Sequence, residues 1–296
     1  MNQKYTGPLT LPVEGNPEKI KVLMYHLVTD DKNFANKYPK LCVHVDEFRY
    51  HLKLLERWNY TAITFEDYRL FLEGELDLPK KPIIITFDDG FSETFKLTLP
   101  LLQEYGVKAV YFVLGDRKIK TSVWDTYVCG TTIPLMNDEQ ILELHEAGFE
   151  IGSHSLKHGR LPLLNREQAW EEISRSRMSL EILLNAPVRN FAYPYGMLNQ
   201  TIKEMVKDAG YTFGCATYTG PPQFGSDKYE FRRILIPGKI NIIGFALRVR
   251  IPYQYYAFAI WKSRKSLSSK TTLVNSADSV EADGRENKIR KMEKGK

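Results

Sequence analysis

Cysteine is scarce in this chain: Cys42, Cys129 and Cys215 are its whole thiol content among 296 residues. Three scattered thiols exclude a disulfide framework and a Cys-based zinc site, so we expect them to be reduced and mostly buried. Long apolar runs are also missing, since none approaches the ~18 residues needed to cross a bilayer. Residues 1–8 lack the apolar core of a secretory signal, and the initiating Met1 favours a cytoplasmic protein over one whose leader was removed.

Excess positive charge is absent from most of the chain. The net charge is +5, yet the stretch from Phe245 to Lys296 alone holds 12 basic and 5 acidic residues, which is +7. The remainder is therefore close to neutral. This distribution predicts a tail with an anionic partner and argues against a nucleic-acid-binding fold. Nothing in the sequence implies a protein partner.

Strand-like apolar runs alternate with helical patterns along most of the chain. The predicted strands cover residues 20–25, 61–64, 83–85, 108–114, 148–152, 188–193, 213–216 and 231–236. The predicted helices cover residues 46–58, 65–73, 91–105, 137–146, 165–184 and 199–209. This alternation predicts an α/β fold with parallel strands, a distorted (β/α) barrel that is incomplete or nearly closed.

Composition shifts divide the chain into four parts. Residues 1–18 form a polar, extended leader, and residues 19–240 form one large domain. Residues 241–262 are aromatic and basic, a mixture that suits a membrane interface, although packing on the core explains it equally well. Residues 263–296 are basic and lack an apolar period, so we expect a disordered tail.

Two short segments carry the chemistry. Asp88 and Asp89 follow the apolar strand at residues 83–85, which places two carboxylates at the carboxyl end of a barrel strand. His154 and His158 follow another short strand, with three residues between them. One carboxylate and two imidazoles, with positions left open for water, are the ligand set of a hydrolytic metal site. The segments predict a metal-dependent hydrolase.

With a third segment, FAYPYG at residues 191–196, these motifs resemble the polysaccharide deacetylase family, also called carbohydrate esterase family 4. The family's catalytic region is named after a nodulation chitooligosaccharide deacetylase. The resemblance spans residues 21–236 and identifies residues 19–240 as the deacetylase domain. It is nearest to the poly-N-acetylglucosamine deacetylase-like subgroup, which has an N-terminal catalytic histidine.

The resemblance implies a role for each site residue. Asp89, His154 and His158 would bind a divalent metal, with Zn²⁺ the first candidate and Co²⁺ or Ni²⁺ as alternatives. Asp88 would be the catalytic base. The backbone N–H of Tyr195 would help to polarise the acetyl carbonyl. The side chain of Tyr195 has a simpler alternative, which is apolar packing.

The acid that protonates the leaving amine departs from the usual family pattern. Most members carry it in a Leu-His-Asp type segment near the C-terminus, but no histidine follows His158 in this chain. His26 ends the first predicted strand and so reaches the rim that holds the metal ligands. We assign His26 as the general acid, with a structural role at the strand end as the alternative. We interpret His44, His51 and His145 as surface or helix residues.

The sequence position of the cation that orients the catalytic base also differs from the usual family pattern. Many relatives have an arginine for this purpose in the third segment, where this chain has Ala192. Arg232 and Arg233, at the start of a late strand, are the available replacements. The sequence leaves open whether Arg232 or Arg233 orients the catalytic base.

The leading hypothesis is a hydrolase that removes N-acetyl groups from N-acetylated aminosugars of a polysaccharide or a lipid-linked glycan. Trp124 and Tyr127 are candidates for stacking on sugar, or for a simple lid. An amide or O-acetyl ester hydrolase on a non-polymeric substrate and a glycan-binding pseudo-enzyme are the alternatives. We expect the protein in the cytoplasm, with peripheral contact to the inner face of the plasma membrane through residues 241–262 if the membrane interpretation holds.

Overall fold

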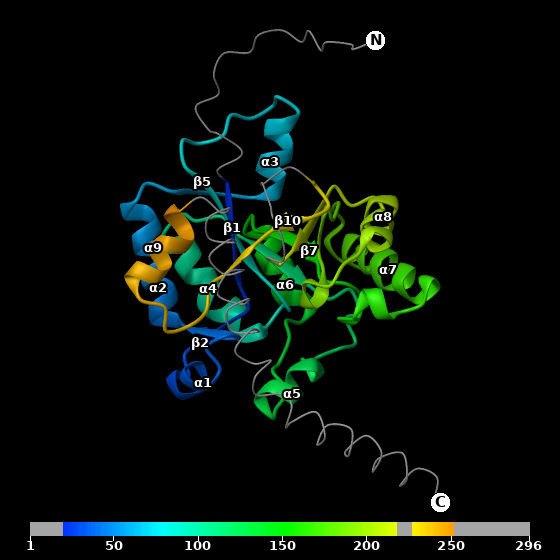
Figure 1. Cartoon of the computed structure of the whole chain (residues 1–296), viewed down its shortest axis with the longest axis horizontal. Coiled ribbons are helices and arrows are strands. Elements are labelled where there is room, and N and C mark those ends of the chain that lie inside the picture. Colours follow the sequence, from blue (N-terminus) through cyan, green and yellow to red (C-terminus); the bar gives the residue numbers. More distant parts are fainter. Residues whose placement is uncertain (1–19, 218–226, 252–296) are drawn as a thin grey trace, which may run out of the picture. The chain divides into compact units, whose positions relative to one another are not determined.

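The structure is a computed structural model that describes residues 20–217 and 227–251 (Figure 1). The strands are β1 (Lys21–Tyr25), β2 (Leu27–Thr29), β3 (Cys42–His44), β4 (Thr61–Ile63), β5 (Pro82–Phe87), β6 (Val110–Val113), β7 (Glu150–Ser153), β8 (Asn190–Ala192), β9 (Phe213–Ala216), β10 (Phe231–Arg232) and β11 (Ile234–Leu235). The predictions for residues 1–18, 252–262 and 263–296 lie outside the described residues.

The helices occupy the connections between the strands. They are α1 (Lys32–Lys37), α2 (Val45–Arg57), α3 (Phe65–Leu72), α4 (Ser92–Glu104), α5 (Thr126–Cys129), α6 (Asp138–Glu146), α7 (Arg166–Leu184), α8 (Gln200–Asp208) and α9 (Ile242–Arg250). Three of them start at the capping boxes Thr64/Asp67, Asn137/Gln140 and Asn165/Gln168, in which side chains satisfy the free backbone N–H groups.

The strands form a parallel barrel that is closed except at one seam. Their order is β10-β9-β8-β7-β6-β5-β1-β11, and β4 pairs with the start of β5. β10 and β11 belong to one stretch of chain, interrupted at Arg233. Its first two residues pair with β9 and its last two with β1, so the path returns to the segment where it began. The predicted (β/α) barrel is therefore confirmed.

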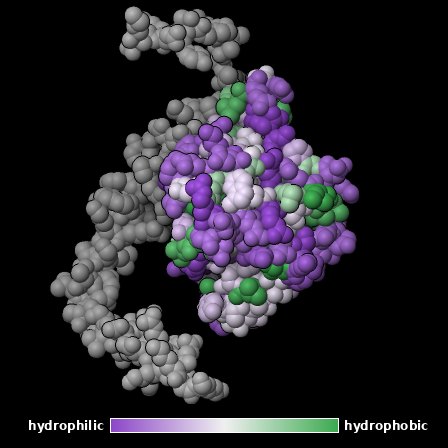
Figure 2. All heavy atoms as spheres, turned by 90° about the vertical axis from the view of Figure 1, so that its right-hand side faces the viewer, coloured by the Kyte–Doolittle hydropathy of each residue, from purple (hydrophilic) through white to green (hydrophobic). Residues whose placement is uncertain are grey.

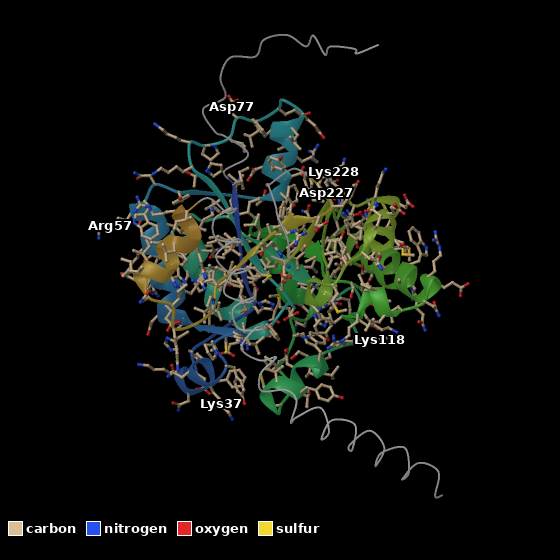
Figure 3. The ribbon with its side chains drawn as sticks, in the orientation of Figure 1. Lys37, Arg57, Asp77, Lys118, Asp227 and Lys228 are labelled. Carbon is tan, nitrogen blue, oxygen red and sulfur yellow. The ribbon has the colours of Figure 1, made fainter. Side chains whose placement is uncertain are left out.

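One hydrophobic cluster fills the barrel interior, with the rings of Phe65, Phe112, Phe213 and Phe231 among its members. Phe65 and Phe231 stack with ring centroids 5.6 Å apart. Charged side chains such as Lys37, Arg57 and Lys118 lie at the periphery (Figure 3). The face shown in Figure 2 is mostly hydrophilic with separate apolar spots, as expected for a layer of outer helices around a buried barrel.

Helix α9 packs on the domain through one apolar face. Phe245 and Val249 are buried, and the Phe245 ring stacks on His51 with centroids 4.2 Å apart and planes within 8°. The Tyr60 hydroxyl donates to the Val249 carbonyl at 3.2 Å. Part of the aromatic and basic segment thus packs against the core. None of the helices in the described ranges is long and apolar enough to span a membrane.

The sequence did not predict β2, α1 and β3. β2 and β3 pair in parallel as a separate two-stranded sheet directly after β1. Each strand has three residues, too short for an alternation pattern to stand out from its flanks. The connection matters for the site because Leu27 and Cys42 join a cluster with Phe91 and Leu114, next to the barrel's carboxyl rim.

Candidate active site

The barrel strands bring the two motifs to one rim. Asp88 and Asp89 follow the last residue of β5, and His154 follows the last residue of β7. β1 pairs with β5 so that Tyr25 lies opposite Phe87, and His26 therefore follows beside Asp88. The Asp88 N–H donates to the Tyr25 carbonyl at 3.0 Å, which fixes this arrangement.

Asp89, His154 and His158 form a compact, buried cluster. Asp89 Oδ1 lies 3.3 Å from His154 Nε2 and 3.2 Å from His158 Nε2, and one atom from each residue lies within 4.8 Å of the other two. A tetrahedral ion with bonds of about 2.1 Å would separate its ligand atoms by about 3.4 Å. The three side chains therefore have the spacing of a divalent metal site.

Hydrogen bonds from the surrounding chain hold the His154 imidazole and the backbone at His158 in place. His154 Nδ1 lies 2.8 Å from the Ala192 carbonyl, which makes Nδ1 the donor and leaves the lone pair of Nε2 for a metal. The backbone N–H of His158 donates to Ser155 Oγ at 2.9 Å. The Glu172 carboxylate accepts the Lys157 N–H at 2.9 Å, so α7 anchors the loop between the two histidines.

Three site residues have the left-handed backbone that side chains disfavour. φ is +71° at Asp89, +63° at His158 and +59° at Tyr195. Such a conformation costs about 1–2 kcal/mol for a residue with a Cβ. Backbone strain of this kind gathers at functional sites, where the surrounding fold enforces a geometry that the local chain would not choose.

Unpaired polar atoms gather at the same place. Within the described residues, six buried side-chain atoms lack a hydrogen-bond partner: His26 Nδ1, Asp89 Oδ1, Trp124 Nε1, Asp125 Oδ2, His158 Nδ1 and Asn190 Oδ1. All of these atoms except Asn190 Oδ1 belong to the site or to the connection between β6 and α6. Folded proteins rarely leave such groups unpaired, so the clustering indicates a place built for a ligand. An ion would supply the missing partner of Asp89 Oδ1.

Arg233 forms a bidentate ion pair with Asp88. The guanidinium is fully buried, and it donates to Asp88 Oδ1 at 2.6 Å and to Oδ2 at 2.7 Å. It also donates to Thr86 Oγ1 at 3.1 Å. Burial alone would raise the pKa of Asp88, but the charge of Arg233, together with those of His154 and His26, holds this pKa below its ordinary value.

Of the two arginines that the sequence left open, the structure brings Arg233 to Asp88. Arg232 instead pairs with Glu230. Successive residues of an extended chain point to opposite sides, so Arg233 shares a face with the buried Phe231. This alternation was the signal in the sequence that could have separated the two arginines.

His26 lies at the site, half-buried, between β1 and β2. Its charge is close enough to lower the pKa of both Asp88 and Asp89. Its Nδ1 atom is buried without a hydrogen-bond partner among the described residues. His26 is therefore near the two carboxylates, and its assignment as general acid remains a prediction.

Aromatic rings surround the cluster. Trp124 stacks on His158 with ring centroids 4.1 Å apart and planes within 14°. The Tyr195 ring meets His158 edge to face at 4.6 Å, and the Arg160 guanidinium lies 4.3 Å from the Tyr195 ring centroid. Tyr127, the second predicted sugar-stacking residue, is 97% exposed. The sequence did not predict the Trp124–His158 stack, because it joins residues on separate connections.

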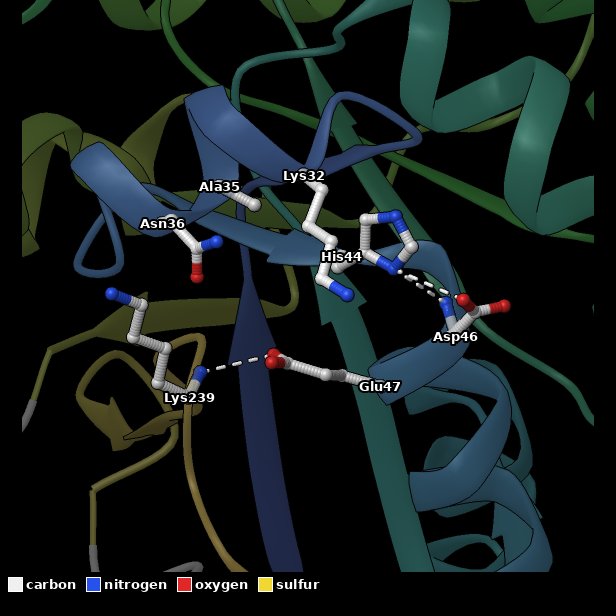
Figure 4. A pocket seen from close by; sticks show the side chains of 7 residues that line it. All are labelled: Lys32, Ala35, Asn36, His44, Asp46, Glu47 and Lys239. Atoms are coloured by element: carbon white, nitrogen blue, oxygen red, sulfur yellow. Dashed lines mark hydrogen bonds and ion pairs between the residues drawn. The ribbon is translucent and has the colours of Figure 1, made fainter.

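The other histidines serve the fold. His44 caps α2 by accepting the Asp46 N–H, and His145 lies on α6. His51 lies on α2 as expected but is buried there, and burial lowers its pKa to about 3. A pocket beside α1 is lined by His44 together with charged residues, among them Glu47, whose carboxylate accepts the Lys239 N–H at 3.0 Å (Figure 4). None of the predicted site residues lines that pocket.

Comparison with known proteins agrees with this geometry. The family model for polysaccharide deacetylases matches residues 75–214. YxkH of Bacillus subtilis, whose name describes it as a candidate polysaccharide deacetylase, is 26% identical over 223 residues, covering 75% of this chain and 73% of that protein. A poly-β-1,6-N-acetyl-D-glucosamine N-deacetylase of Staphylococcus aureus is 22% identical over 249 residues, covering 75% and 83%.

Solved structures share the fold. The Streptococcus pyogenes deacetylase PplD aligns with a TM-score of 0.66 at 22% identity, covering 79% of this chain and 99% of that structure. IcaB from Ammonifex degensii aligns with a TM-score of 0.62 at 21% identity, covering 81% and 97%. The barrel and its buried Asp-His-His cluster have the architecture and the donor set of a metal-dependent hydrolase. Within that class, the chain belongs to the polysaccharide deacetylase family, distantly related to the poly-N-acetylglucosamine deacetylases.

Proposed function

We propose that this protein removes N-acetyl groups from N-acetylated aminosugars of a polysaccharide or a lipid-linked glycan, using a divalent metal bound by Asp89, His154 and His158. The observation that carries the proposal is the buried cluster of these three side chains beside a carboxylate that Arg233 clamps. A binding protein would have no need for a second, oriented carboxylate next to a metal site.

A divalent ion at this cluster would polarise the acetamide carbonyl and make water more acidic. Asp88 takes the proton from the attacking water. Its lowered pKa keeps it ionised at neutral pH, and the two bonds from Arg233 fix the direction of its lone pairs. His26 gives a proton to the sugar nitrogen as the C–N bond breaks, so acetate and a free amine leave. The backbone N–H of Tyr195 supports the oxyanion.

The comparisons support an aminosugar as the substrate. The relative from Staphylococcus aureus is named for its action on poly-β-1,6-N-acetyl-D-glucosamine, and it matches three quarters of this chain. The aromatic rings of Trp124 and Tyr195 beside the cluster suit the apolar face of a pyranose. Zn²⁺ is our first choice of metal because it accepts one carboxylate and two imidazoles in tetrahedral geometry.

The test is release of acetate and free amine from a panel of free, polymeric and undecaprenyl-linked N-acetylhexosamines. Metal-loaded wild type is compared with Asp88→Asn and His26→Ala. We expect release by wild type alone, and the best substrate identifies the carrier. Release from O-acetyl esters but from none of these amides would replace the proposal with an esterase. Bound metal without any release would indicate a glycan-binding pseudo-enzyme.

We also propose that the protein works in the cytoplasm, with peripheral contact to the inner face of the plasma membrane. Ile242, Ile243 and Leu247 on α9 are 45%, 66% and 45% exposed, so the outer face of this helix is apolar. Basic residues are concentrated from here to the C-terminus. Fractionation of cells that express deletions of residues 263–296 and 241–296 tests this, because equal membrane recovery of both deletions and full chain would contradict it.

A further inference from the structure

The connection between β6 and α6, residues 114–137, is a fixed structure above the metal cluster. Its two sides are bridged between Thr121 and Pro134, and the Ser122 N–H donates to the Ile133 carbonyl at 2.8 Å. Trp124, near its tip, stacks on the metal-site residue His158. The connection therefore places the side chains around Trp124 at a defined distance from the reaction.

Two adjacent residues of this connection have a buried polar atom with no partner among the described residues. One is the donor Trp124 Nε1 and the other is the acceptor Asp125 Oδ2. The Asp125 side chain is nearly inaccessible, with 6% of the residue exposed. The Asp125 carboxylate is within hydrogen-bonding reach of Ser122, but a buried oxygen without a partner is costly, so Oδ2 needs one that the described residues do not supply.

Asp125 directly follows Trp124, so it lies next to the residue that stacks on His158. Its burial and the nearby charge of Asp89 raise its pKa to about 6, and its own charge contributes to the raised pKa of Tyr195. Asp89 and Tyr195 both lie against His158, the residue on which Trp124 stacks. Within the described residues, no Asp125 oxygen belongs to the group of ligand atoms. The Oδ2 atom is therefore free to accept a hydrogen bond from a bound ligand.

The chemistry of the pair restricts what can bind. An unpaired acceptor and an unpaired N–H donor on adjacent residues suit a partner with both functions, and a sugar hydroxyl has both. A simple acetamide or acetyl ester, once its acyl group is at the metal cluster, has no hydroxyl left for the pair. The arrangement favours a substrate that presents hydroxyl groups next to its N-acetyl group.

We propose that Trp124 and Asp125 form a hydroxyl-binding subsite for the sugar that carries the N-acetyl group. The Asp125 carboxylate accepts a hydrogen bond from a hydroxyl of this sugar, and the Trp124 N–H donates to an oxygen of the same sugar. The inference rests on the proposed deacetylase function and deepens it, because it makes Asp125 and Trp124 determinants of specificity for sugar amides.

The test compares two substrates of the metal-loaded full chain: a β-1,6-linked N-acetylglucosamine oligomer, and 4-nitrophenyl acetate, which has no hydroxyl group. The variants are Asp125→Ala, Asp125→Asn and Trp124→Phe, of which the last keeps a ring on His158 but removes the N–H. The matched control is Asp116→Asn, because Asp116 lies on the same connection and its carboxylate already accepts the Lys118 N–H at 3.1 Å. Metal content and thermal unfolding are measured for each variant.

We expect Asp125→Ala to lower kcat/KM for the oligomer roughly 10- to 100-fold, the usual effect of losing a hydrogen bond to a charged group. In Asp125→Ala, turnover of 4-nitrophenyl acetate and metal content should stay within about twofold of wild type. Trp124→Phe should also lose kcat/KM for the oligomer selectively, but by a smaller factor. Equal loss on both substrates, or no loss on the oligomer, overturns the subsite. A wild type that cleaves the ester but never the oligomer overturns the deacetylase proposal itself.

Discussion

The bidentate pair between Arg233 and Asp88 allows one prediction to be worked through in detail. Both partners are buried, and the two bonds are 2.6 and 2.7 Å long. Replacing Arg233 by Met leaves a buried carboxylate without its cation, which typically costs about 3–5 kcal/mol of stability. That is a large part of the 5–15 kcal/mol typical of a folded protein, so we expect Arg233→Met to fold with reduced stability.

The effect on activity follows from the role of Asp88. A positioned general base contributes about 10²- to 10⁴-fold, so loss of its orientation should lower kcat by a substantial part of this range. The pKa of Asp88 should also rise once the cation is gone, because burial then acts alone. A base works only when ionised, so the acid limb of the pH–rate profile should move to higher pH. Bound metal should be unchanged, since Arg233 contacts no ligand atom of the cluster within the described residues.

Arg232→Met is the control, because it removes the neighbouring cation, which pairs with Glu230. Both variants are assayed for kcat at several pH values, for metal content and for urea unfolding. The double variant Asp88→Asn/Arg233→Met should be destabilised by less than the sum of its single variants, because it leaves no unpaired charge. Equal kcat losses in the two arginine variants, or an unmoved acid limb in Arg233→Met, would refute the reasoning.

Three further changes test other parts of the structure. His154→Ala should reduce bound metal far below one ion per chain, measured by elemental analysis after dialysis; full retention would exclude His154 as a ligand. His26→Gln should lower kcat by about 10²-fold or more with metal content unchanged, since it removes only the proton donor; wild-type kcat would return His26 to a structural role. Phe245→Ala should destabilise the protein by about 3–5 kcal/mol in urea unfolding, because its buried ring stacks on His51; a loss under 1 kcal/mol would mean that α9 is loosely attached. Each result is compared with wild type at the same pH and metal load.

Much of the barrel was predictable because its signals are local. The apolar run at residues 83–85 lies within β5, and the two aspartates that follow this strand can be recognised from neighbouring residues alone. Asn165 with Gln168 marks the start of α7 through chemistry confined to four residues. The histidines of the cluster were equally visible, since the carboxyl ends of parallel strands meet at one rim.

What could not be predicted depends on contacts between distant segments. Arg233 reaches Asp88 across 145 residues of sequence, so this contact has no local signal, although alternation with the buried Phe231 favours Arg233 over Arg232. The stack of Trp124 on His158 and the position of Asp125 depend on how the β6–α6 connection folds over the rim. No local sequence signal marks Asp125, because its burial comes entirely from tertiary packing.

The most direct test of the central claim is a metal titration of the metal-free protein, with acetate and free amine measured together on a β-1,6-linked N-acetylglucosamine oligomer. A deacetylase with the site described should release the two products in equal amounts, gain activity up to one divalent ion per chain, and lose it in Asp88→Asn while the ion stays bound. Binding of one ion without any release of acetate, or equal release by wild type and Asp88→Asn, would contradict the account.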